Sequence, residues 1–71
     1  MITKTQMTEM EKLKHLLEHW IDHNESHVKN YEKWALKADN SGENKLSEIL
    51  KQIAKESKKL EGLFKKAIEI I

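Results

Sequence analysis

The stretch Asp39-Asn40-Ser41-Gly42 is the only cluster of turn-forming residues in this chain of 71 residues. Asp, Asn and Ser favour turns because their short side chains hydrogen-bond to the nearby backbone, and Gly accepts a positive φ. Gly42 suits the left-handed position that ends a helix, and Ser41 or Asn44 suits the cap of a following helix. We therefore expect one turn here, with a helix on either side of it.

Before the turn, apolar side chains recur at intervals of three and four residues, which is typical of one face of a helix. Thr8 and Glu11 form a capping-box pattern, so we expect this helix over about residues 8–40. Residues 1–7 lack clear periodicity, and we expect them to fray. The predicted face consists of Met10, Leu13, Leu17, Trp20, Asn24, His27, Tyr31, Trp34 and Ala38, widened by Leu16, Val28 and Ala35.

The turn is predicted at 41–42, and the residues after it repeat the same spacing over about residues 43–70. Because the connection is short, the two helices must lie antiparallel, and the fold class is an all-α two-helix hairpin forming a single domain over 1–71. Folding the chain about the turn places Trp20 near Gly62, where the missing side chain would make room for the indole. The second face consists of Leu46, Ile49, Leu50, Ile53, Ser57, Leu60, Phe64, Ala67, Ile68 and Ile71.

A chain of this length forms only a marginal core without metals, disulfides or partners, and the absence of Cys excludes disulfides. The large apolar side chains offer more area than a lone hairpin can bury, and such a patch usually marks an interface. We therefore expect a homo-oligomer, with a dimer favoured, in which hairpins pair into a four-helix or larger bundle.

The charge pattern excludes several classes of protein. The net charge is +1, and 13 Lys without Arg are balanced by 12 acidic residues, so we expect no nucleic-acid partner. No apolar run is long enough for a membrane span and no signal-peptide pattern is seen, so we expect no membrane association and a cytoplasmic protein. Because no nucleophile–base pair or pocket-forming loop is visible, we do not expect an enzyme.

The distinctive feature is a ladder of histidines, His15, His19, His23 and His27, each four residues after the last. A step of four residues turns the helix by only about 40°, so neighbouring imidazoles share one strip and can bind one metal ion together. The strip drifts around the helix, so we expect His15 in solvent, His19 at the boundary, His23 beside the core and His27 in it. His23 and His27 are therefore the candidate metal ligands, and His19 is a third.

Both predicted faces become polar in one layer. Asn24 and His27 on the first helix are expected at the level of Ser57 and Glu56 on the second, and buried polar groups need partners. To close the site, we expect Glu56 as a further ligand, or else the histidines of a symmetry-related copy or water. Asn24 and Ser57 are candidates for fixing the register. Asp22 is either an acceptor for an imidazole N–H or a surface charge. Alternatively, His27 hydrogen-bonds to Glu56 or Ser57 without any metal.

Two functions from different classes fit these residues. The first is a small non-catalytic protein that stores, carries or senses a divalent transition metal. Without thiolates, Zn, Ni, Co and Cu all suit imidazole ligands. The second is a purely structural or protein-interaction module, with a protein partner, in which the polar layer sets the register.

The segment His19-Trp20-Ile21-Asp22-His23-Asn24-Glu25-Ser26-His27 resembles a group of small prokaryotic helical hairpins with an H-W-x-x-H-N-x-x-H signature. Over residues 10–71, the aromatic residue at Tyr31, the pair Trp34-Ala35 and the turn at Gly42 also match. We associate this group with transition-metal handling in anaerobes, such as that of nickel or cobalt. The resemblance implies that His19, His23, Asn24 and His27 are the shared site positions, whereas His15 falls outside the signature.

Overall fold

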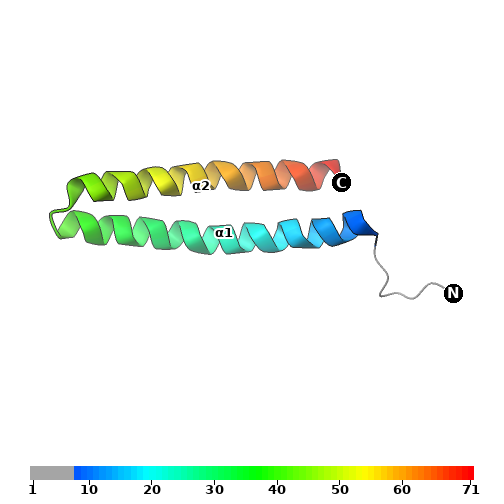
Figure 1. The fold of residues 1–71 in the computed structure, drawn as a ribbon, viewed down its shortest axis with the longest axis horizontal. Coiled ribbons are helices and arrows are strands. Elements are labelled where there is room, and N and C mark those ends of the chain that lie inside the picture. The colour runs from blue at the N-terminus through cyan, green and yellow to red at the C-terminus, as the bar shows by residue number, and fades with distance from the viewer. Residues whose placement is uncertain (1–7) are drawn as a thin grey trace.

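The computed structural model describes residues 8–71, which form two helices and no strand: α1 (Glu9–Asn40) and α2 (Asn44–Ile70). The helices lie antiparallel and side by side (Figure 1), so the prediction of an all-helical hairpin is confirmed. Each helix begins one residue later than we predicted, and the predicted fraying of residues 1–7 lies outside the described residues. Neither described helix is both long and apolar enough to cross a membrane.

The turn between the helices is closed by backbone hydrogen bonds. The N–H of Glu43 donates to the carbonyl of Ala38 at 2.9 Å, and the N–H of Gly42 donates to that of Asp39 at 3.0 Å. This pair of bonds is a Schellman motif, which needs a residue in the left-handed region after the helix end. Gly42 has a φ of +82°, so its predicted left-handed conformation is confirmed.

The start of α2 differs from our prediction. Neither Ser41 nor Asn44 caps the helix, because Glu43 occupies the N-cap position and makes no side-chain cap hydrogen bond. Ser41 instead ends α1, and Asn44 is already the first residue of α2. The first turn of α2 is closed by the backbone bond from the N–H of Ser47 to the carbonyl of Glu43, at 2.9 Å.

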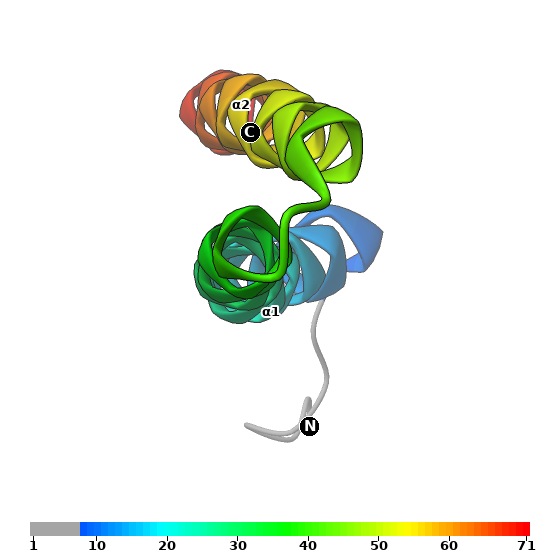
Figure 2. The same cartoon turned by 90° about the vertical axis from the view of Figure 1, so that its left-hand side faces the viewer.

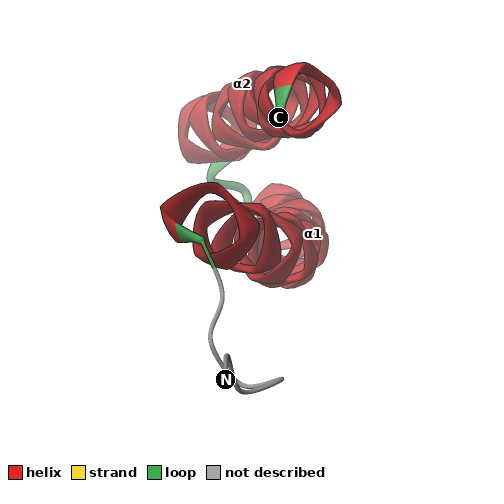
Figure 3. Ribbon diagram, turned by 90° about the vertical axis from the view of Figure 1, so that its right-hand side faces the viewer, coloured by secondary structure: helices red, strands yellow, loops and turns green. Residues whose placement is uncertain are grey.

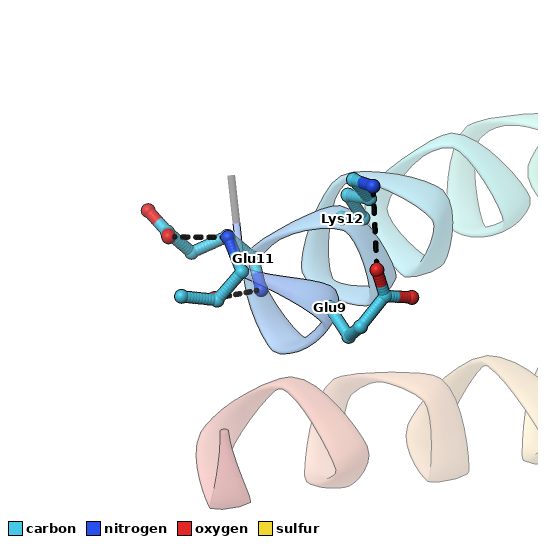
Figure 4. A network of polar contacts seen from close by, with 4 residues as sticks. Glu9, Glu11 and Lys12 are labelled. Carbon is cyan, nitrogen blue, oxygen red and sulfur yellow. Dashed lines mark hydrogen bonds and ion pairs between the residues drawn. The ribbon is translucent and has the colours of Figure 1, made fainter. Parts of the chain in front are cut away.

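The start of α1 carries the predicted capping box (Figure 4). The N–H of Glu11 donates to the Thr8 hydroxyl at 3.1 Å, and the N–H of Thr8 donates to the Glu11 carboxylate at 3.0 Å. Two backbone donors that a helix end leaves without partners are thereby satisfied. Lys12 lies 3.3 Å from the Glu9 carboxylate in the same turn.

The helices meet along a line of mostly small or medium side chains. Ser47 is fully buried, and its hydroxyl donates to the carbonyl of Ala35 at 2.8 Å. The spacing of three and four along both helices is typical of packing at about 20°, and the end-on views show the axes inclined to one another (Figures 2 and 3). We call these residues the contact line: Leu17, Ile21, Asn24, Val28, Tyr31, Ala35 and Ala38 on α1, with Ser47, Leu50, Ala54, Ser57, Glu61, Phe64 and Ile68 on α2.

The predicted face of α1 was wrong at alternate positions. Trp20 and Trp34 were expected between the helices, but they are 40% and 56% exposed. Ile21, Val28 and Ala35 take the inner positions instead. The physical reason is size, because small residues on the contact line let the helix backbones approach closely, and an indole does not fit there.

The displaced aromatic and aliphatic residues gather on one side of the hairpin. Trp20 packs against Phe64 with ring centroids 6.3 Å apart, and Trp34 lines a shallow hollow together with Leu46 and Leu50. We call this side the apolar flank. It is formed by Leu16, Trp20, His27 and Trp34 on α1 and by Leu46, Ile49, Ile53 and Leu60 on α2.

The other side of the hairpin, which we call the charged flank, is polar. There Lys58 of α2 lies 2.8 Å from the Glu32 carboxylate of α1, and Glu25, Lys29 and Glu61 line the same surface. Exposed charges of both signs are well solvated, so this side needs no further covering.

Gly62 does not have the role that we predicted for it. A Cβ built there meets no atom within 4 Å, so the glycine does not make room for the indole of Trp20. We therefore expect Gly62→Ala to stabilise the protein by about 0.5–1 kcal/mol, because glycine in a helix interior costs backbone entropy. Thermal and urea unfolding measure the change.

The matched control is Gly42→Ala. At a φ of +82° the new side chain is strained, so this variant should lose about 1 kcal/mol. Destabilisation by Gly62→Ala as well would mean that the helix has no space at this position.

The capping box should give the protein a defined acid sensitivity. The bond from the Thr8 N–H lowers the pKa of Glu11 below its ordinary value of 4.5, and the Thr8 side chain adds to this effect. A lowered folded pKa stabilises the protein fully above the unfolded pKa, and this contribution is lost as pH falls through the folded pKa. We expect the stability advantage of wild type over Glu11→Gln to shrink as pH falls below 4.5, measured by thermal unfolding. Glu9→Gln, in the same helical turn, is the control, and an equally large pH-dependent difference for it would contradict the prediction.

Candidate metal site

Three of the four histidines form a continuous column of rings on α1. The rings of His19 and His23 are stacked with centroids 5.7 Å apart, and those of His23 and His27 meet edge to face at 4.9 Å. The ring of Tyr31 stacks on His27 at 6.1 Å and ends the column. The predicted strip of imidazoles is therefore present, and its tightest pair is His23 and His27.

His15 lies at the solvent-exposed end of the ladder. Its Nδ1 is 3.6 Å from the Glu18 carboxylate, and both side chains are more than half exposed. The ring contacts of the column begin only at His19. His15 therefore takes no part in the ring column that the three other histidines form.

His27 was expected in the core, and that expectation was wrong. The core position at this level is taken by Val28, which is 6% exposed, whereas His27 is exposed. The predicted face coincides with the contact line only at alternate positions, and His27, like Trp20 and Trp34, is at one of the positions outside it. His23 and His27 border a shallow hollow, which is lined by Trp20, His23, Asn24, His27 and Phe64.

The polar layer between the helices is present, but it is simpler than predicted. The Nδ2 of Asn24 donates to the backbone carbonyl of Ser57 at 2.8 Å, so the two residues lie at one level as expected. Both are half-buried. The hydrogen bonds found for residues 8–71 include none from His27 to Ser57 or Glu56.

The Glu56 carboxylate contacts residues of its own helix. Its Oε2 accepts a hydrogen bond from Gln52 at 2.8 Å and lies 3.3 Å from Lys59 Nζ, and all three residues belong to the exposed surface of α2. Asp22 is also exposed. Within the described part of the chain, no three His, Asp or Glu side chains converge as one metal ion would require.

The geometry of His23 and His27 nevertheless suits two ligands of one ion. Two nitrogens bound to a tetrahedral ion at 2.0–2.1 Å lie about 3.3 Å apart. Rings at i and i+4 with centroids 4.9 Å apart reach this spacing by rotamer adjustment. The pair can thus supply half of a tetrahedral coordination shell, and the other half must come from elsewhere.

Tyr31 is a feature of the site that the sequence interpretation missed. It was assigned to the helix face and to the family resemblance but not to the metal site, yet it stacks on His27 and shields one side of that ring. The signal was available, because Tyr31 follows His27 by four residues and so continues the period of the ladder.

A comparison with known protein families identifies the family of this chain. A family described as "Domain of unknown function (DUF8180)" matches residues 13–71. The chain belongs to this family. The matched range contains all four histidines and both sides of the contact line.

A similar protein is also known. A protein of Archaeoglobus fulgidus, named "Uncharacterized protein", is 36% identical over 62 residues, which cover 87% of this chain and 98% of that protein. No solved structure is significantly similar to the chain. Because neither the family description nor the name of the relative states a ligand, the function must be argued from the residues.

The bond between Asn24 and Ser57 gives a direct test of the polar layer. Asn24→Asp keeps the shape of the side chain but replaces the donor with a carboxylate oxygen that faces the carbonyl. We expect a loss of about 1–3 kcal/mol of unfolding free energy in urea, because a half-buried polar group loses its partner. Ser57→Ala keeps the backbone acceptor and should change stability by less than about 0.5 kcal/mol. Equal losses from both variants would show that the Ser57 hydroxyl matters instead.

Proposed function

We propose that the protein is a small non-catalytic store, carrier or sensor of a divalent transition metal, bound by imidazoles on α1. The observation that carries this proposal is the column of His19, His23 and His27, with successive ring centroids 5.7 and 4.9 Å apart. Structural histidines are commonly single, whereas this column repeats one side chain at the spacing that directs neighbouring nitrogens to the same ion.

His23 and His27 are the proposed central ligands, and His19 is the proposed third. Without cysteine, the donors are nitrogen and oxygen, which suits Zn(II), Ni(II), Co(II) or Cu(II). The resemblance to hairpins with the H-W-x-x-H-N-x-x-H signature supports the same positions. Glu56 is the weaker candidate within one chain, since Gln52 and Lys59 already contact its carboxylate.

We also propose that hairpins associate into a four-helix bundle, with a dimer as the favoured form. Only five residues of the described chain are buried, and one of them is the polar Ser47. The apolar flank meanwhile leaves Trp34 and Ile49 more than half exposed. Burying such side chains contributes about 25 cal/mol per Å² of apolar surface, which favours association.

The rival function is a structural or protein-interaction module. The observation that favours it is the bond from Asn24 to Ser57, which fixes the register of the helices without any metal. A polar contact of this kind in a helical seam selects one alignment over others. The apolar flank would then bind a protein partner.

Titration calorimetry with zinc and nickel tests the metal proposal. We expect His23→Ala/His27→Ala to bind at least about tenfold more weakly than wild type, because two donors are lost. His15→Ala, outside the column, should bind like wild type. Because protons compete for imidazole nitrogen, wild-type affinity should fall between about pH 8 and about pH 5.

Thermal unfolding with chelator and with added metal distinguishes the rival, since an ion bound only by the folded state raises its stability. No stabilisation of wild type by zinc or nickel, together with no binding heat, would favour the structural module.

A further inference from the structure

On α2 an apolar stripe runs between the contact line and the apolar flank. On α2 the stripe follows spacings of four and three without interruption. It shares Leu50, Ser57 and Phe64 with the contact line, and Leu46, Ile53 and Leu60 with the apolar flank. Such a stripe is the core pattern of a bundle in which each helix has two neighbours. Its members are Leu46, Leu50, Ile53, Ser57, Leu60, Phe64, Ala67 and Ile71.

The apolar flank is also nearly symmetric along its length. On α1, Trp20 and Trp34 lie seven residues before and after His27. On α2, Ile53 and Leu60 lie on either side of the pair Glu56-Ser57. The bond from Asn24 to Ser57 brings these two midpoints within about one helical turn of the same level.

This symmetry makes the flank complementary to a copy of itself. A half-turn about an axis perpendicular to the helices at this level would place Trp20 of one hairpin over Trp34 of another. Ile53 would likewise lie over Leu60. A two-fold axis joins the same patch on both subunits, as this pattern requires. The charged flank offers no such surface, because Glu32 and Lys58 already pair there at 2.8 Å.

We propose that two hairpins join their apolar flanks about this axis, and that one metal ion is bound at the axis by His23 and His27 of both chains. The proposal rests on the proposed metal-binding function and names its missing ligands. Each hairpin supplies two imidazoles with centroids 4.9 Å apart, and two such pairs complete a tetrahedral shell. Glu56 would lie near the axis on the α2 side, where Lys59 of its own chain, 3.3 Å away, offsets its charge.

The stoichiometry of binding tests the shared site. Zinc or nickel titration followed by calorimetry, with native mass spectrometry of the product, should give one ion per two chains. The apparent affinity should rise with protein concentration, because the ion binds the dimer. One ion per chain would overturn the shared site, and this is the ratio expected if Glu56 of a second copy or water completed each histidine pair. The metal-binding function would then survive. Absence of any binding would overturn both.

A matched pair of variants tests the role of the flank. Trp34→Glu places a charge on the apolar flank about 10 Å along the helix from His27, beyond any coordination contact. We expect it to be monomeric by light scattering and to bind metal at least about tenfold more weakly. Leu36→Glu removes an apolar side chain that is 62% exposed beside Glu32, Asp39 and Lys51. It should keep both the dimer and the affinity.

Circular dichroism shows whether Trp34→Glu keeps its helices. A helical, monomeric Trp34→Glu that binds metal as tightly as wild type would overturn the shared site but not the metal-binding function. If the variant loses its helices, the ratio of ions to chains in the wild type decides the question.

Discussion

The close approach of the two helices along small side chains is the constraint on which the rest of the structure depends. Ala35, Ser47 and Ala54 are at most 3% exposed, and the Ser47 hydroxyl bonds directly to the backbone of the other helix. An indole is too large for backbones packed in this way, whereas the smaller rings of Tyr31 and Phe64 remain half-buried on the contact line. The indoles therefore lie beside the contact line together with the exposed imidazoles, and this placement creates both the apolar flank and the accessible column of histidines.

Much of this fold follows from local signals in the sequence. The capping box of Thr8 and Glu11 and the left-handed Gly42 depend on short-range chemistry, and both were predicted. The alignment of Asn24 with Ser57 joins the two helices, but it follows from the position of the turn and was predicted as well. The rotation of the helices about their axes was not predicted, since periodicity locates an apolar stripe but does not say which neighbour it faces. The pattern thus placed His27 where Val28 lies.

The unpredicted rotation of the helices also explains which features of the site could be established from the sequence and which could not. The spacing of four residues fixes the ring column, because helix geometry alone brings His23 and His27 together. The partner of the column depends on the second helix. The candidate named on that helix was Glu56, whose carboxylate contacts Gln52 and Lys59. Long side chains on a helix surface have several partners within reach, so the sequence does not select among them.

Completion of the metal site and completion of the core pose the same geometric problem. Imidazoles from one strip of one helix approach an ion from one side only, and a tetrahedral shell also needs donors from the opposite side. Within the described hairpin, no third His, Asp or Glu side chain converges on the pair, and the Ser57 carbonyl already accepts a hydrogen bond from Asn24. The apolar stripe of α2 likewise lacks a facing surface on that same side. A second copy packed on the apolar flank would supply both the missing donors and the missing facing surface. Metal binding and assembly would then be thermodynamically linked, each strengthening the other.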